Sequence, residues 1–90
     1  KPLTFQGERL VLNFSTSAAG TIRVEIQDAD GKPIEGFSLA DAAEVFGDDL
    51  ERTVTWRHGS DVSRLAGQPV RLRFTLSDAN LYAFQFQPAP

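Results

Sequence analysis

The chain contains no cysteine and no methionine. Without cysteine it can form neither a disulfide framework nor a thiolate nucleophile, and the absence fits oxidising and reducing compartments equally. Without methionine even at the first position, the chain is expected to be a processed piece or an excised module. Cysteine chemistry is therefore excluded, but the compartment is left open.

Excess basic charge and long apolar runs are also missing. Nine Lys and Arg oppose twelve Asp and Glu, for a net charge of −3, whereas a nucleic-acid-binding domain usually presents a basic face. No apolar run approaches the roughly 20 residues of a membrane-spanning helix, and no signal peptide is recognisable. We therefore expect neither a nucleic-acid partner nor a membrane partner.

Ninety residues are enough for one domain with a modest core, and seven Phe, one Trp and one Tyr supply bulky side chains for it. The last four residues, Gln87-Pro-Ala-Pro90, are typical of a tail or linker. The sequence therefore predicts a domain over residues 1–86 and a C-terminal tail over residues 87–90.

Alternation of apolar and polar residues is the clearest pattern in the chain. It is strictest in Val70-Arg-Leu-Arg-Phe-Thr-Leu76 and recurs in four other segments, residues 9–15, 21–27, 52–57 and 81–87. Such alternation is typical of antiparallel sheets with one buried and one solvated face. With a short opening strand at residues 3–5, the pattern predicts an all-β fold: an antiparallel two-sheet β-sandwich, jelly-roll-like, of about six to seven strands.

The same alternation predicts which side chains form the core. The inward-facing residues are Leu10, Leu12, Phe14, Ile22, Val24, Ile26, Val70, Leu72, Phe74 and Leu76. One segment has a different period, with Leu39, Ala42, Ala43 and Phe46 at helical spacing. Ser38 suits the N-cap and Gly47 the C-terminal stop, so one short helix is predicted between them.

Two carboxylate pairs, Asp28 with Asp30 and Asp48 with Asp49, have the residue types that glycoside hydrolysis requires. Both pairs lie in turn-like segments, where Asp is favoured for its local hydrogen bonds, and we expect turn or helix-end roles. A calcium loop starting at Asp28 would need Glu at its twelfth position, which is Leu39. We predict no metal and no cofactor, although a looser calcium site remains open.

His58 is the only histidine, and Ser60 and Asp61 follow it closely. A nucleophile–base–acid set needs these three groups in one geometry, which a tight loop rarely provides. One histidine without cysteine also falls short of a zinc site. We expect an exposed loop histidine and no catalytic residue.

Several segments together resemble a known family. Residues 61–74 resemble a segment of galactose-binding-like jelly rolls. The motifs Thr21-Ile-Arg-Val-Glu-Ile-Gln-Asp-Ala-Asp-Gly31, Gly36-Phe-Ser-Leu-Ala-Asp41, Trp56 before Gly59-Ser-Asp61, and Asp78-Ala-Asn-Leu-Tyr-Ala-Phe84 follow in that order. This set resembles the C-terminal β-sandwich of bacterial proteins related to glycoside hydrolase families 32 and 43.

The resemblance implies a non-catalytic accessory domain that follows a five-bladed catalytic propeller. In that family the catalytic carboxylates belong to the propeller, so the resemblance assigns no catalytic residue to this chain. It implies a neighbouring catalytic domain as partner, a secreted or periplasmic location, and carbohydrate as a possible ligand. The alternative function is a purely structural module that packs on the catalytic domain and stabilises it.

Six residues are candidates for carbohydrate contact, because aromatic rings cover the apolar face of a sugar while polar groups bind its hydroxyls. They are Trp56, Arg57, His58, Tyr82, Arg71 and Arg73. Each has an alternative role. Trp56 shares its parity with Val54 and suits the core, and Tyr82 suits core or interdomain packing. The arginines suit a solvated sheet face.

Overall fold

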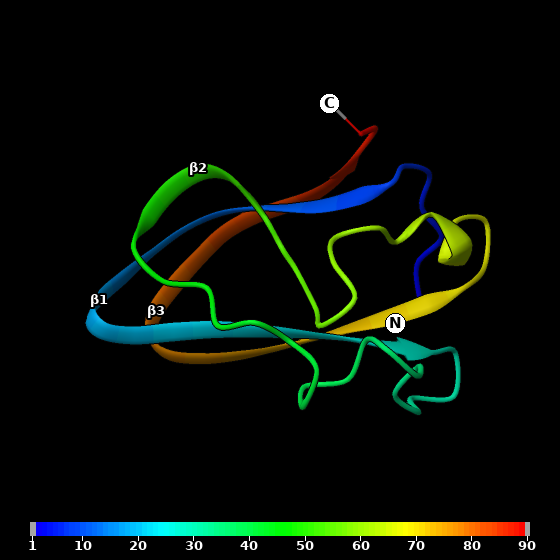
Figure 1. Cartoon of the computed structure of the whole chain (residues 1–90), viewed down its shortest axis with the longest axis horizontal. Coiled ribbons are helices and arrows are strands. Elements are labelled where there is room, and N and C mark those ends of the chain that lie inside the picture. The colour runs from blue at the N-terminus through cyan, green and yellow to red at the C-terminus, as the bar shows by residue number, and fades with distance from the viewer. Residues whose placement is uncertain (1, 90) are drawn as a thin grey trace.

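The computed structural model describes residues 2–89 as one three-stranded antiparallel sheet with the order β2-β1-β3 (Figure 1). The strands are β1 (Arg9–Asp28), β2 (Asp48–Thr53) and β3 (Val70–Gln87), and a short 3-10 turn, η1, covers Ser63–Leu65. The all-β class is confirmed, but the structure has one sheet of three strands in place of two sheets of six to seven. No helix in this part of the chain is long and apolar enough to cross a membrane.

The three strands still form two layers, because β1 and β3 are long and bend together. They pair from Arg9 opposite Gln87 to Asp28 opposite Val70, and the register shifts between Thr16 and Thr21. Figure 1 shows β1 running to the bend at one end of the molecule and returning below itself, with β3 following the same path. The predicted strands 9–15 and 21–27 are thus two halves of β1, and the predicted loop between them is the bend.

The bend depends on a close approach between the two backbones. A Cβ atom on Gly20 would lie 2.3 Å from the carbonyl oxygen of Asp78, so only glycine fits at this position. Asp78 has a positive φ of 47°, which aspartate tolerates better than most residues. The tightest part of the bend is therefore built from one residue without a side chain and one with unusual backbone geometry.

The core lies between the two layers. Its buried members come from both halves of β1, the start of β3, η1 and the loops, and they are Phe5, Leu10, Leu12, Phe14, Ile22, Val24, Ile26, Phe37, Val45, Val54, Trp56, Val62, Leu65 and Val70. The predicted inward face of β1 is confirmed throughout. On β3, Leu72 and Phe74 are only partly buried, and Leu76 is 47% exposed, so its predicted burial is wrong. The reason is position, since β3 is an edge strand and its side chains are covered on one flank only.

The predicted helix between Ser38 and Gly47 is wrong. The segment makes one turn, in which Asp41 N–H donates to Ser38 O, and then becomes extended. Val45 forms a two-hydrogen-bond bridge with Ile22, at 2.8 Å in each direction. Ile22 is fully buried, so its backbone groups need partners, and this requirement outweighs the local helical spacing.

The chain ends of the described region are held to the sheet. Leu3 bridges Val70, so the predicted opening strand is reduced to a single pair. Gln87 is the last residue of β3, and Ala89 N–H donates to the Glu8 carboxylate at 2.7 Å. Lys1 and Pro90, which belong to the predicted domain and tail, lie outside the described residues.

We predict that Gly20→Ala lowers the free energy of unfolding by about 1–3 kcal/mol, because the new methyl group must displace the backbone of β3. The measurement is urea denaturation followed by tryptophan fluorescence. Ala19→Ser, at the exposed neighbouring position, is the control and should change stability by less than about 0.5 kcal/mol. Equal stability of Gly20→Ala and the wild type would show that the bend is not tight.

We also predict different costs for two phenylalanines. Phe14→Ala should lower the free energy of unfolding by about 3–5 kcal/mol, the range for a fully buried ring. Phe74→Ala should cost clearly less, because this ring is only partly buried at the sheet edge. The same denaturation experiment measures both, and equal losses would contradict the edge position of Phe74.

Candidate functional site

The six sequence-predicted residues lie in three separate places. Residues 56–58 are in the loop that follows β2, Tyr82 is on the outer face of the second half of β3, and Arg71 with Arg73 is on the outer face of its first half. The fold therefore does not bring them into one site.

Trp56 belongs to the core. Its side chain is 3% exposed, and its indole N–H donates to the carbonyl oxygen of Val24 at 2.9 Å. Its ring packs edge-on against Phe37, with 5.1 Å between the ring centroids. No face of the indole is left for a ligand, so Trp56 holds the loop to β1.

His58 and Arg57 are exposed in the same loop. The His58 ring packs against Phe37 at 4.8 Å between centroids, and its Nε2 lies 3.3 Å from the carbonyl oxygen of Asp61. The Asp61 carboxylate instead accepts the N–H of Ser63 at 2.8 Å, so it fixes the start of η1 and does not orient the histidine. The nucleophile–base–acid arrangement is not formed, and Arg57 forms an exposed ion pair with Asp41.

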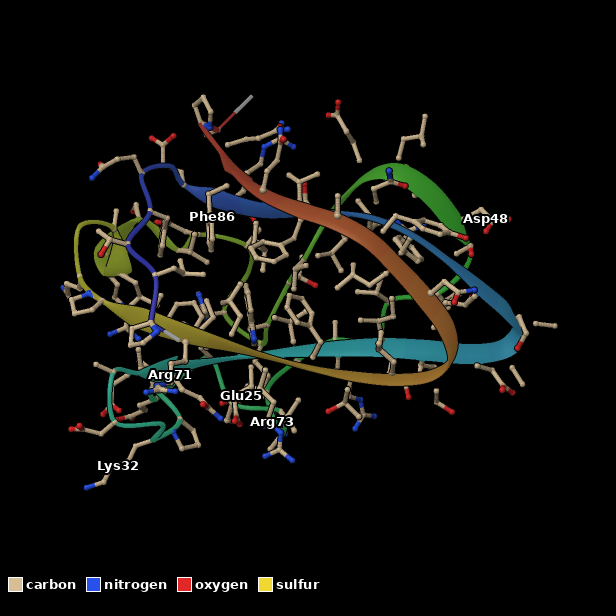
Figure 2. The ribbon with its side chains drawn as sticks, turned by 180° about the vertical axis from the view of Figure 1, so that it is seen from behind. Glu25, Lys32, Asp48, Arg71, Arg73 and Phe86 are labelled. Atoms are coloured by element: carbon tan, nitrogen blue, oxygen red, sulfur yellow. The ribbon has the colours of Figure 1, made fainter. Side chains whose placement is uncertain are left out.

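Arg71 and Arg73 point away from the core beside Glu25, as Figure 2 shows. Arg71 Nε donates to the carbonyl oxygen of Ala29 at 2.9 Å. Arg73 stands opposite Glu25 in the register of β1 and β3. Glu25 is buried, and its carboxylate accepts hydrogen bonds from the Gln27 amide at 2.7 Å and from a backbone N–H at 3.1 Å. The solvated-face alternative describes the exposed Arg73, whereas Arg71 is half-buried and bound to Ala29.

Tyr82 is the one candidate whose ring is open to solvent. It is 63% exposed, and its hydroxyl lies 3.0 Å from Ser15 Oγ on β1. A shallow groove runs between the ring and β2, and we call it the Tyr82 groove. Its lining residues are Asn13, Phe14, Ser15, Asp48, Asp49, Leu50 and Tyr82.

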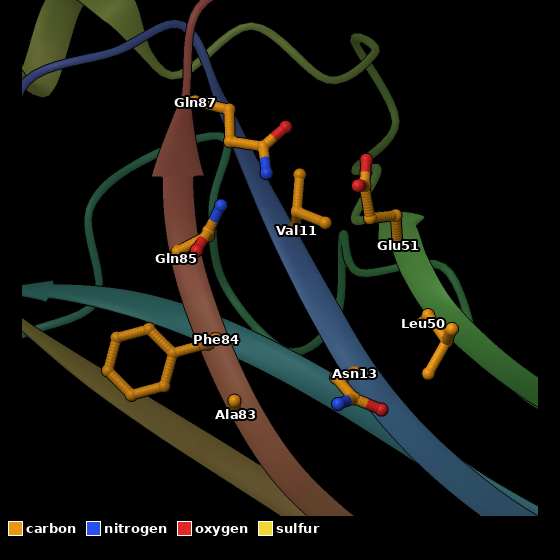
Figure 3. A pocket seen from close by; sticks show the side chains of 8 residues that line it. All are labelled: Val11, Asn13, Leu50, Glu51, Ala83, Phe84, Gln85 and Gln87. Carbon is orange, nitrogen blue, oxygen red and sulfur yellow. The ribbon is translucent and has the colours of Figure 1, made fainter.

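A second hollow of about 200 Å³ adjoins the groove on the same outer face (Figure 3). It shares Asn13 and Leu50 with the groove, and its other lining residues are Val11, Glu51, Ala83, Phe84, Gln85 and Gln87. Together the two hollows present an aromatic ring, a hydroxyl, amides and carboxylates on three paired strands. This set can hydrogen-bond a polar ligand while covering one apolar face of it.

Sequence reasoning missed the polar part of this surface. Asp48 and Asp49 pair with β1, opposite Ser15 and Phe14. The segment does not alternate in hydropathy, so no periodic signal marked it as a strand. Only the pairing of β2 with β1 places its carboxylates near Tyr82.

The predicted turn role is confirmed for Asp28 and Asp30 but is wrong for Asp48 and Asp49, which lie in β2. Asp28 Oδ1 accepts the N–H groups of Asp30 and Lys32 at 2.9 and 3.0 Å. Asp49 accepts the N–H of Glu51 and a hydrogen bond from Arg52 Nε, both at 3.1 Å. Over residues 2–89 no group of three or more acidic or histidine side chains could hold a metal ion.

The carboxyl groups of Asp49 and Asp61 have a lowered pKa. The N–H of Glu51, followed by the Arg52 side chain, lowers the pKa of Asp49 from its ordinary value of 3.8. The hydroxyl and N–H of Ser63, with a smaller effect of the His58 charge, lower the pKa of Asp61 from 3.8. In the folded chain these local contacts stabilise the ionised form of both carboxyl groups.

Comparison with known protein families, curated proteins and solved structures finds no match to this chain.

The lowered pKa values of Asp49 and Asp61 predict that the chain loses stability in acid. A pKa that is lower in the folded state stabilises the fold above the unfolded value of 3.8, and this stabilisation is lost as the pH falls through the folded value. We expect the double variant Asp49→Asn/Asp61→Asn to lose less stability than the wild type between about pH 6 and about pH 2 in urea titrations. Identical slopes in the wild type and the double variant would contradict the assignment.

Proposed function

We propose that this chain is a non-catalytic accessory domain of a glycoside-hydrolase-like protein and that it contacts carbohydrate at the Tyr82 groove. The observation that carries the proposal is the exposed Tyr82 ring beside a polar groove. A flat ring can cover the apolar face of a pyranose, while neighbouring oxygen and amide groups bind its hydroxyls.

The neighbours of Tyr82 fit a neutral sugar. Asn13 offers an amide, Ser15 a hydroxyl, and Asp48 and Asp49 offer carboxylate oxygens that accept hydroxyl protons. Asp48 makes the groove acidic, which disfavours an anionic ligand, whereas the charge of Asp49 is paired with Arg52. The groove is open and buries little surface, so we expect dissociation constants of about micromolar to millimolar.

The link to a glycoside hydrolase rests on the ordered set of sequence motifs. It includes the expectations of a neighbouring catalytic domain and of a secreted or periplasmic location. The absence of catalysis is part of the same proposal. It is supported by the local hydrogen bonds of Asp28 and Asp49, which account for these carboxylates without a reaction.

A second candidate is a structural module that packs on a neighbouring domain. Leu50 is 78% exposed, and Phe46 is also a large exposed apolar side chain close by in the sequence. Such side chains on a small domain are typical of surfaces that another protein covers. Binding of sugar and burial of Leu50 would use adjoining parts of one face.

The test is to titrate neutral oligosaccharides based on glucose, xylose, fructose and galactose while recording amide chemical shifts. We expect shifts clustered on Asn13, Ser15 and residues 48–50, and Tyr82→Ala should weaken binding at least about tenfold through loss of stacking. Phe46→Ala removes an exposed ring that does not line the groove, and it should bind like the wild type.

Three outcomes would contradict the proposal. Shifts that cluster on residues 57–61 would place the ligand at the loop, away from Tyr82. The absence of shifts with every sugar would favour the structural module. Hydrolysis of chromogenic glycosides by the purified domain, lost on mutation of a named carboxylate, would contradict the non-catalytic role.

A further inference from the structure

We propose that the free edge of β3 around residues 72–76 accepts an extended protein segment as an added antiparallel strand, with apolar side chains inward and acidic side chains outward. We call residues 72–76 of β3 the β3 edge. It lies on the other half of β3 from Tyr82, so the proposal does not depend on carbohydrate binding.

The same side of β3 is already used once, by the chain itself. Leu3 N–H donates to Val70 O at 2.7 Å, and Val70 N–H donates to Leu3 O at 2.8 Å. This antiparallel bridge shows that the edge accepts an added strand and sets its direction. A segment that docks next to Leu3 would continue an existing contact.

The backbone groups that would bind the segment follow from the register. Along an antiparallel strand, the N–H and C=O of one residue point to the same side of the strand, and those of the next residue point to the opposite side. Val70 directs its groups to Leu3, so Leu72, Phe74 and Leu76 direct theirs to the same side, away from β1. Over the described residues no strand pairs with them there.

The side chains at the same positions are apolar and incompletely covered. Leu72 and Phe74 are partly buried, and Leu76 is 47% exposed. Phe84, from the other layer, is also exposed, and its ring centroid lies 5.4 Å from that of Phe74. The inward side chains of an added strand would therefore contact both layers. An edge whose inward side chains are apolar and which contains no Pro is a favoured place for strand addition.

The outward side of the segment is set by charge. Arg71 and Arg73 alternate with the apolar residues and point away from the core (Figure 2). Arg73 is exposed, whereas Arg71 is half-buried and its Nε donates to the carbonyl oxygen of Ala29. Neither forms an ion pair within residues 2–89, and the facing Glu25 already accepts hydrogen bonds from Gln27 and Leu39. Cross-strand neighbours of opposite charge stabilise pairing, so the docking segment should carry Asp or Glu outward.

The same arginines argue against a second copy of this chain. If two β3 edges paired antiparallel, Arg71 and Arg73 of both copies would lie on one face of the joined sheet. Like charges on neighbouring strands destabilise pairing. The charge along β3 therefore favours an acidic partner segment over self-association.

The test uses synthetic peptides with alternating valine and glutamate, added to the 90-residue chain at low salt. We expect the amide protons of Leu72, Phe74 and Leu76 to become protected from hydrogen exchange, while those of Arg71, Arg73 and Thr75 change little because they already face β1. A matched peptide with lysine in place of glutamate should bind at least about tenfold more weakly. Arg73→Ala should reduce this preference.

Backbone pairing is tested without altering the protein. Peptides N-methylated at alternate residues lose hydrogen-bond donors on one edge only. Methylation on one edge should abolish binding and on the other edge should leave it unchanged. Equal binding of both methylated peptides, or no protection with any peptide at millimolar concentration, would overturn the proposal. The proposal would also be overturned if the chain without peptide sedimented as a dimer and the amide protons of Phe74 and Leu76 were protected from exchange in that dimer.

Discussion

The close approach of Gly20 to the backbone of Ser77 and Asp78 is the contact on which the two-layer shape depends. Because β1 and β3 turn together there, one hydrogen-bonded ribbon supplies both layers of the core. A Cβ at position 20 would separate the two strands where they are most strongly bent. The inward faces of the two halves of β1 would then no longer meet, although each half alternates correctly along its own length. The long strands give the chain its core only through this bend.

Position within the sheet then determines what each strand does. β1 is central and has partners on both sides: β3 along one side, and β2 with the Val45 and Phe37 segments along the other. Its inward residues are fully buried as a result. β3 carries the same alternation but has a partner on one side, so its apolar residues are less covered toward Leu76. The same alternation of apolar and polar residues thus gives a buried central strand in β1 and a partly exposed edge strand in β3.

The sequence allowed the strand faces to be predicted but not their connections. Period-two alternation is local, so Leu10, Ile22 and Val70 were placed correctly. A bent strand and two strands joined by a loop have the same local pattern, which is why one folded sheet was predicted as a sandwich. The helical spacing near Ala42 was real but was outweighed by the backbone partners that buried Ile22 requires. For Trp56, parity with Val54 indicated the core, whereas its aromatic chemistry suggested a ligand; the hydrogen bond to Val24 shows that the parity was the better guide.

The two proposed surfaces follow from the same folded ribbon and do not compete. The Tyr82 groove is built across β2, β1 and β3 on the outer face of one layer, so backbone pairing holds its ring and polar groups. The β3 edge belongs to the other layer and offers unpaired backbone groups beside two arginines. A strand added to that edge would cover Phe74 and Leu76 and leave Tyr82 in solvent. A strand held at the β3 edge and a ligand held at the Tyr82 groove would therefore occupy separate faces of the same folded ribbon.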